Sequence, residues 1–219
     1  MSLFNSRFYD FNVHKDSTSI TELAFGAKKY GYCGIAIVNS AITNEDKLPE
    51  DFSIYGSVEI SGKPSKLREE IKKHKGTDAI LTVIGGDEEL NRAAVETEGL
   101  DILLQPAQFN NVLAKAASDN SVAIGFNLGS LVRLRGEARV RELMIMRENL
   151  KHARKYDLRM ILTGTARSIY DFRSPREMAA IAGIFGMTKE EAVDAMSAAP
   201  LEILRRKNPD YIQEGIEIL

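Results

Sequence analysis

Short runs of apolar residues alternate along this chain with longer segments in which apolar positions recur every three or four residues. Several of the short runs, such as Gly-Ile-Ala-Ile-Val at 34–38, are apolar throughout, which is typical of parallel strands buried on both faces. The seven predicted strands are Arg7–Val13, Cys33–Asn39, Ile54–Ile60, Ala79–Ile84, Ile102–Leu104, Val122–Phe126 and Met160–Thr163.

The segments between the strands carry helix-start signals. Ser19-x-x-Glu22 and Ser174-Pro175-x-Glu177 read as capping boxes, in which a side-chain oxygen and a glutamate satisfy the first free N–H groups of a helix. Thr188-x-x-Glu191 predicts a further helix start. The other predicted helices are Lys66–His74, Glu88–Glu98, Asn110–Asp119 and the longest one, Glu137–Tyr156.

This alternation of strands with helices or loops indicates a parallel sheet. The chain has 219 residues and carries no glycine-rich dinucleotide fingerprint, so the pattern favours a TIM-barrel-like (βα)n barrel over an open doubly wound sheet. No Pro/Ser/Gly-rich linker interrupts the pattern. We therefore expect one α/β barrel domain over residues 1–219, with about seven parallel strands and surrounding helices.

Composition narrows the class of protein further. Hydrophobic residues make up 44% of the chain and the formal net charge is −2, as in ordinary globular proteins. The single cysteine, Cys33, excludes a disulfide framework and a cysteine-rich zinc site. No apolar run is long enough to span a membrane, and the N-terminus has no signal-peptide pattern. These features predict a cytoplasmic protein without a membrane partner.

Polar residues follow several predicted strands, where a (βα) barrel places its functional groups. They are Asp10, Asn12, His14, Asn39, Gln105 and Arg167. A hydrolytic metal centre needs several imidazoles and carboxylates together, and of these six only Asp10 and His14 qualify. The other two histidines, His74 and His152, fall on polar helices and are expected to be solvated. The sequence predicts no metal site and no catalytic residue.

The six positions resemble the metal-binding motifs of the polymerase-and-histidinol-phosphatase (PHP) phosphoesterase superfamily, a metal-dependent barrel. That superfamily carries D-x-H-x-H after the first strand, T-D-H after the second, A-H-P in the middle and G-S-D-A-H late. Here the corresponding segments read D-x-N-x-H at 10–14, V-N-S at 38–40, L-Q-P at 104–106 and G-T-A-R at 164–167. Amides and a guanidinium cannot replace imidazole as metal ligands. The resemblance implies a PHP-related barrel with degenerate site positions.

Longer motifs resemble one family over nearly the whole chain: protein component 3 of archaeal ribonuclease P, related to the thirty-kilodalton eukaryotic subunit. The most specific segments are 8–13, 31–36, 147–156 and 173–177. The resemblance implies a subunit of the endoribonuclease that removes 5′ leaders from precursor tRNA. It implies as partners ribonuclease P RNA, precursor tRNA, protein component 2 and other protein subunits. Chemistry with Mg²⁺ is then expected on the RNA, with no cofactor in this chain.

Charge is distributed unevenly along the chain, and this observation does not depend on the family resemblance. Residues 133–176 hold ten of the fifteen arginines, and their twelve Lys and Arg outweigh five acidic residues to give a net +7. A basic stretch in an acidic chain indicates a surface for a polyanion. Arg133, Arg135 and Arg139 belong to or follow a predicted loop at 129–136. The predicted RNA-binding residues are Arg133, Arg135, Arg139, Arg147, Lys151, Arg154, Arg167, Arg173 and Arg176.

Other interpretations remain open at this stage. The charges on the long helix could form a solvated face with local Glu–Arg pairs, and Arg173 could pair with Asp171 or Glu177. Asp10 and His14 could hold one metal ion in a reduced PHP-type phosphoesterase. A metal-free barrel enzyme could bind an anionic substrate through Arg167 and Gln105. The N-terminal aromatics at 8, 9 and 11 are interpreted as core residues rather than base-stacking ones.

Overall fold

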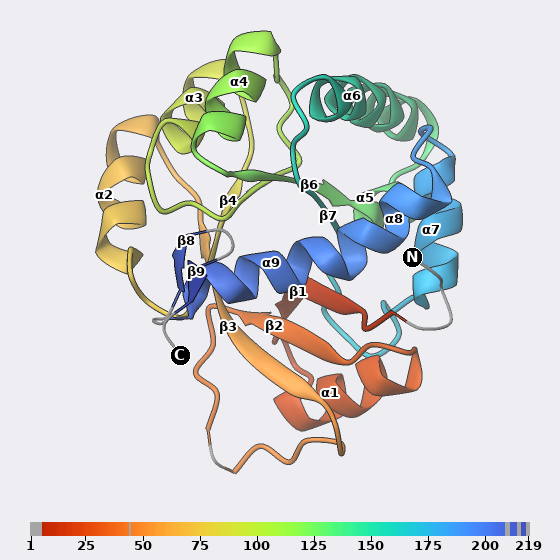
Figure 1. Ribbon diagram of the computed structural model, residues 1–219. Helices are drawn as coiled ribbons and strands as arrows, with labels where there is room; N and C mark the ends of the chain where they lie inside the picture. Colours follow the sequence, from red (N-terminus) through yellow and green to blue (C-terminus); the bar gives the residue numbers. More distant parts are fainter. Residues whose placement is uncertain (1–5, 44, 209–210, 214–215, 218–219) are drawn as a thin grey trace.

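All seven predicted strands are present and parallel in the computed structural model, which describes residues 6–43, 45–208, 211–213 and 216–217. Their hydrogen-bonded order follows the chain, from the first strand to the seventh, and the sheet curls into a nearly closed barrel (Figure 1). The predicted TIM-barrel-like fold is confirmed. The strands are β1 (Tyr9–His14), β2 (Gly34–Val38), β3 (Ser53–Ile60), β4 (Ile80–Ile84), β5 (Ile102–Leu104), β6 (Ala123–Asn127) and β7 (Met160–Thr163).

Side chains and single backbone contacts join β1 to β7, since no ladder pairs these two strands within the described residues. The Asp10 carboxylate accepts a hydrogen bond from Oγ1 of Thr163 at 2.5 Å and one from the Gly164 N–H at 3.0 Å. Further along, the His14 N–H donates to the Ala166 carbonyl at 2.8 Å. The seam of the barrel is therefore closed by a buried carboxylate at the position where the sequence suggested a metal ligand.

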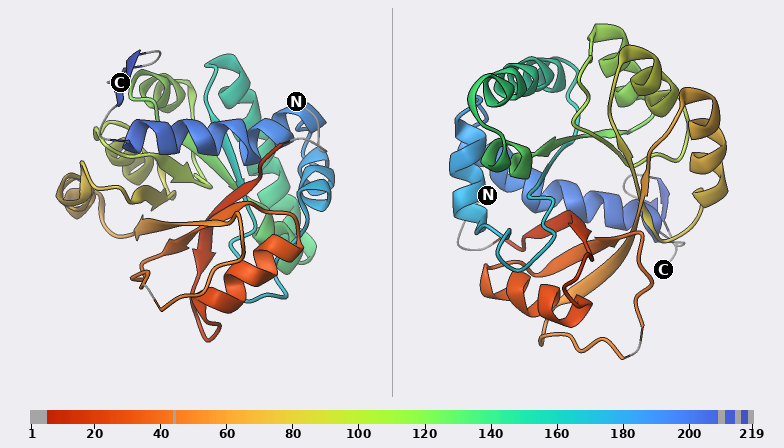
Figure 2. Two further views of the ribbon diagram at one scale, coloured as in Figure 1. Left: turned by 60° about the horizontal axis from the view of Figure 1, so that its bottom comes forward. Right: turned by 180° about the vertical axis from the view of Figure 1, so that it is seen from behind.

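Amphipathic helices cover the outside of the barrel (Figure 2). The three predicted helix starts at Ser19, Ser174 and Thr188 are confirmed as capping boxes. The apolar faces of the helices pack on outward-pointing strand residues such as Ile35, whereas the polar faces contact solvent. These helices are α1 (Ile20–Lys29), α2 (Pro64–His74), α3 (Glu88–Val95), α4 (Asn111–Asp119), α6 (Gly136–Lys155), α7 (Pro175–Gly183) and α8 (Lys189–Met196).

The prediction of a loop at 129–136 is wrong, because most of this segment forms the short helix α5 (Leu128–Arg133). Asn127 caps this helix by accepting from the Ser130 N–H at 3.1 Å. Gly129 lets α5 approach β7 closely, since a Cβ at this position would lie only 2.1 Å from the Gly164 carbonyl oxygen. Arg133 consequently lies in a helix, and Arg139 in α6.

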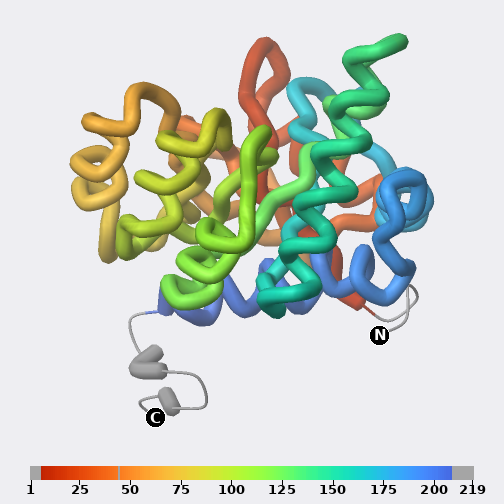
Figure 3. Tube along the Cα trace, turned by 90° about the horizontal axis from the view of Figure 1, so that it is seen from above, coloured from red at the N-terminus to blue at the C-terminus, as the bar shows by residue number. Residues whose placement is uncertain are grey.

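A last helix, α9 (Ala198–Lys207), was not predicted and crosses the amino-terminal end of the barrel (Figures 1 and 3). Ala199 and Ile203 join the apolar interior of the barrel from below. The C-terminal end of α9 is fixed by an ion pair of 2.6 Å between Lys207 and the buried Asp101. The barrel residues of this interior cluster are Tyr9, Phe11, Ala36, Ile80, Ile102, Leu104, Ala123 and Ile161.

Two short antiparallel strands follow α9: β8 (Tyr211–Gln213) and β9 (Ile216–Glu217). Neither was predicted. No helix in the described part of the chain has both the length and the apolar character needed to cross a bilayer. Because α9 closes the amino-terminal end, the polar residues that follow the strands lie at the opposite end of the barrel, its mouth.

Candidate functional site at the barrel mouth

Three polar side chains from β1 and β3 meet at the mouth. Asn12 donates through Nδ2 to Oε2 of Glu59 at 3.1 Å, and its Oδ1 lies 2.9 Å from Nε2 of His14. Nε2 of His14 also lies 3.6 Å from Oε2 of Glu59. Two of the six predicted positions, Asn12 and His14, are therefore in direct contact, with a glutamate that the sequence analysis did not select.

The two residues needed by the phosphoesterase alternative have different partners. Both oxygens of Asp10, which is 1% exposed, are engaged by Thr163, Gly164 and the Asn12 N–H. The charged groups that act on His14 are Glu59, Arg167, Asp16 and Arg133. Within the described residues, no three His, Cys, Asp or Glu side chains gather closely enough to hold a metal ion. The donor set at this mouth does not fit a hydrolytic metal centre.

Three non-glycine residues just beyond strand ends adopt left-handed backbone angles: Asn39 with φ 49°, Gln105 with φ 56° and Thr165 with φ 44°. Asparagine tolerates this region, but a β-branched threonine rarely does. Such conformations cost about 1–2 kcal/mol each and persist where the surrounding structure holds them. Asn39, which is exposed, is held by exchanging hydrogen bonds with the backbone of Glu59. Asp51, Ser121 and Asp157 adopt similar angles ahead of β3, β6 and β7, so left-handed residues occur at both ends of the barrel.

A hydrogen-bonded network holds Thr165 in place. Arg133 donates through Nη2 to Oγ1 of Thr165 at 2.9 Å, and that hydroxyl donates to Oδ1 of Asn127 at 2.9 Å. Asn127 also caps the N-terminal end of α5, and Arg133 is the last residue of that helix. The network therefore connects both ends of α5 to Thr165. The network holds the exposed side chain of Arg133 at the rim.

Gln105, another predicted position, contacts the long helix. Its Nε2 donates to Oε1 of Glu142 in α6 and lies 3.3 Å from Oγ of Ser130. Burial raises the pKa of the Glu142 carboxyl, and the hydrogen bond from Gln105 opposes that rise. Gln105 is thus a link between the mouth and α6, and its amide group is already occupied.

The nine predicted RNA-binding residues differ in the kind of group that each side chain contacts. Arg133, Arg135 and Arg139, here called the rim arginines, contact only neutral oxygens. Arg135 and Arg139 each reach the Val132 carbonyl at 3.4 Å, a long hydrogen bond. Within the described residues, no carboxylate forms an ion pair with any of the three. Of the other six, Arg147, Arg173 and Arg176 likewise lack an ion pair in the described part of the chain, whereas Lys151, Arg154 and Arg167 have one.

The cations further along α6 bind within the chain. Arg154 makes two charge-assisted hydrogen bonds to Glu191, at 2.7 and 2.8 Å, and one to the Gly186 carbonyl. Arg147 donates to the Ile184 carbonyl at 3.1 Å, and Lys151 pairs with Glu148 at 2.6 Å. Arg147 and Arg154 thus hold the turn between α7 and α8 against α6. RNA binding by these three residues stays a prediction.

The loop between β7 and α7 carries the remaining three. Arg167 is exposed and pairs with Asp16 at 3.1 Å. Arg173 donates through Nη1 to the carbonyls of Tyr170 and Phe172. It therefore does not form the ion pair with Asp171 or Glu177 that the sequence left open. Arg176 is exposed in the first turn of α7 and has no hydrogen bond or ion pair within the described residues.

Two residues at the mouth, Glu59 and Glu142, were not predicted from the sequence. Glu59 lies one residue before the end of β3 and Glu142 lies inside α6, and their partners are 47 and 37 residues away. A carboxylate at the end of an otherwise half-buried strand was the available signal for Glu59. The expectation for His152 was wrong: its ring packs edge-on against Phe109 with centroids 6.1 Å apart, and burial lowers its pKa.

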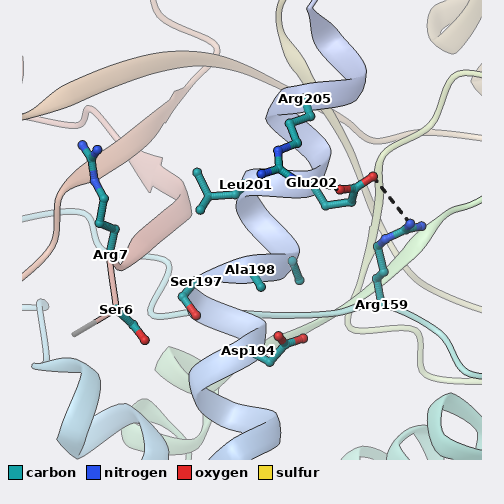
Figure 4. Close-up of a pocket in the computed structure, with 10 residues that line it drawn as sticks. Ser6, Arg7, Arg159, Asp194, Ser197, Ala198, Leu201, Glu202 and Arg205 are labelled. Carbon is teal, nitrogen blue, oxygen red and sulfur yellow. Dashed lines mark ion pairs between the residues drawn. The ribbon is translucent and has the colours of Figure 1, made fainter. Parts of the chain in front are cut away.

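A cavity of about 580 Å³ lies at the opposite end of the barrel, beside α9 (Figure 4). Arg159 points toward Glu202 across 3.7 Å, whereas Arg7 lies on the far side of Leu201. Asp194 adds a second carboxylate to the lining. The cavity therefore carries both cations and anions and is not a basic surface.

The half-buried position of His14 predicts a pH dependence of stability. Burial lowers the pKa of His14, and the charges of Arg167 and Arg133 lower it further, although Glu59 and Asp16 oppose them. Below about pH 6.5 the unfolded chain binds a proton that folded His14 resists, so stability should fall as the pH drops. His14→Gln should reduce this loss in urea unfolding between pH 7.5 and 5. A loss equal to that of the wild-type protein would contradict the assignment.

The fold and the mouth together define a class: a nearly closed barrel of seven parallel strands whose mouth, in the described residues, holds amides and arginines instead of a set of metal ligands. The sequence model of a family described as RNase P subunit p30 matches residues 7–209. The chain belongs to this family.

Individual relatives agree with this assignment. The ribonuclease P protein component 3 of Methanococcoides burtonii is 42% identical over 96% of this chain and 93% of its own length. A chain in the cryo-EM structure of archaeal ribonuclease P with mature tRNA has a TM-score of 0.75 and 24% identity, covering 95% of this chain and 97% of that one. An amidohydrolase crystal structure has a TM-score of 0.64 at 8% identity, over 94% of this chain and 75% of its own. The last two likenesses concern the fold.

Proposed function

We propose that this chain is protein component 3 of ribonuclease P and that it acts by binding RNA and other subunits, while an RNA subunit with Mg²⁺ performs the cleavage. The observation that carries the proposal is the mouth itself. The rim arginines contact only neutral oxygens and lie at the end of the barrel where this fold places its functional groups, in a chain that belongs to the p30 family. Ribonuclease P RNA, precursor tRNA, component 2 and other protein subunits are the proposed partners.

Reconstitution tests this function. Cleavage of a 5′ leader from precursor tRNA should be measured with the RNA subunit and the remaining proteins, in the presence and absence of this chain. We expect the chain to raise the cleavage rate, most visibly at low Mg²⁺, because a bound cationic protein reduces repulsion between RNA phosphates. An unchanged rate at every Mg²⁺ concentration would contradict the proposal.

The phosphoesterase alternative makes a different prediction for the isolated chain. It requires a stoichiometric metal that is lost in His14→Ala, together with turnover of a phosphoester by the protein alone. We expect the purified chain to cleave neither RNA nor phosphomonoesters with Mg²⁺, Mn²⁺ or Zn²⁺, because Asp10 is engaged at the seam and His14 by Asn12. Metal-dependent turnover abolished by His14→Ala would reverse this conclusion.

A further inference from the structure

One aromatic side chain stands out on the surface. Tyr170 is 80% exposed, and its ring makes no hydrogen bond or ring contact within the described residues. It lies in the loop between β7 and α7, inside the basic stretch of the chain. The N-terminal aromatics, by contrast, belong to the core as predicted: Tyr9 and Phe11 line the barrel interior.

The loop that presents Tyr170 is held rigidly. The Asp171 carboxylate accepts three hydrogen bonds of 3.0 Å, from the backbone N–H groups of Arg167 and Ser168 and from the Ser168 hydroxyl. Phe172 is 1% exposed and packs against Tyr32 with centroids 6.2 Å apart. An exposed ring on a fixed loop loses little conformational entropy when a ligand covers it.

Cations flank this ring. The guanidinium of Arg173 is anchored on the Tyr170 carbonyl at 2.9 Å, and Arg167 lies three residues before the ring. Arg176 follows in the first turn of α7 without a partner in the described part of the chain. The carboxylates nearby are already engaged: Asp16 with Arg167, and Asp171 with the loop backbone.

We propose that Tyr170 stacks on an unpaired nucleobase of RNA, with the adjacent arginines contacting the phosphates on either side. This inference rests on the proposed function. Unpaired bases bind to proteins by stacking on aromatic side chains among cations. A protein-docking patch would need several hundred Å² of contiguous apolar surface. The adjacent Ile169 instead faces α1, where a Cβ on Gly26 would lie 3.0 Å from it.

The chain contains no tryptophan, so Tyr170→Trp creates a single fluorescent reporter at this position. Stacking of a base should quench its emission during separate titrations with a single-stranded oligoribonucleotide, precursor tRNA and ribonuclease P RNA, and the three arms identify which RNA supplies the base. The matched control is Val112→Trp on α4, where the native side chain is 60% exposed, and its emission should stay constant.

Affinity measurements complete the test. Tyr170→Ala should weaken RNA binding by roughly 5- to 100-fold, whereas Tyr170→Phe should bind as the wild type does. Because no charge is removed, the slope of log Kd against log salt should not change, unlike that of an arginine variant. Wild-type affinity in Tyr170→Ala without quenching in Tyr170→Trp overturns the inference, while the proposed function stands. Failure of the wild-type chain to bind any RNA refutes the proposed function itself.

Discussion

Replacing Asp10 by alanine is expected to lower the free energy of unfolding by about 3 kcal/mol. The variant leaves the Thr163 hydroxyl and the N–H groups of Gly164 and Asn12 buried without their acceptor. Each buried unsatisfied donor costs about 1–3 kcal/mol. Burial of the carboxylate opposes part of this loss, since desolvation raises the pKa of Asp10 despite its three donors. The removal of three hydrogen bonds outweighs that cost, because they also join β1 to β7.

Urea unfolding of Asp10→Ala, Asp10→Asn and Thr163→Val measures the effect. Asp10→Asn keeps the shape and one acceptor oxygen but turns an amide donor toward the other donors, so its loss should be intermediate. Thr163→Val, which removes a single donor to the same carboxylate, should cost about 1 kcal/mol. Asp10→Ala with wild-type stability would show that the seam does not depend on this residue.

Because the pKa of Asp10 is raised, the stability of these variants relative to the wild type should depend on pH. The folded protein holds the Asp10 proton more tightly than the unfolded chain does, so this group stabilises the fold at low pH and loses that contribution as the pH rises through its folded-state pKa. Asp10→Asn lacks the titration. Its stability relative to the wild type should therefore be lowest in acid and improve toward neutral pH.

The strands were predictable because their physical signal is local. A run such as Gly34–Val38 is apolar at every position, and only a strand covered on both faces buries all of it. Helix α9 was missed for the opposite reason. The residues that α9 buries, Ala199 and Ile203, face the barrel interior rather than a sheet surface, and Pro200 in its first turn is compatible with a helix.

The site was predictable in its positions but not in its contacts. Barrel topology alone places Asn12, His14 and Gln105 at one end. Their partners Glu59 and Glu142 come from elements far along the chain, and no local pattern encodes those pairings. The same limit applies to charge: Arg154 and Arg133 look alike in the sequence, yet one binds Glu191 in two places and the other only a hydroxyl.

We expect the rim arginines to contribute strongly to the electrostatic binding of RNA. Arg133→Ala/Arg135→Ala/Arg139→Ala should weaken RNA binding on the order of 100-fold at low ionic strength, since an arginine bound to a phosphate contributes about 1 kcal/mol. The slope of log Kd against log salt should fall by about one for each phosphate that the variant no longer neutralises. The three side chains are suited to this role because only neutral oxygens hold them, so a phosphate does not have to displace a carboxylate.

A matched variant separates the rim from the overall charge. Lys66→Ala/Lys72→Ala/Lys73→Ala removes three exposed cations from α2, across the barrel from α6 (Figure 2), and both triple variants change the formal net charge from −2 to −5. If phosphates bind at the rim, only the rim variant should lose affinity and salt dependence at this scale. Equal losses in the two variants would mean that RNA responds to total charge, and the rim would then have no special part in binding.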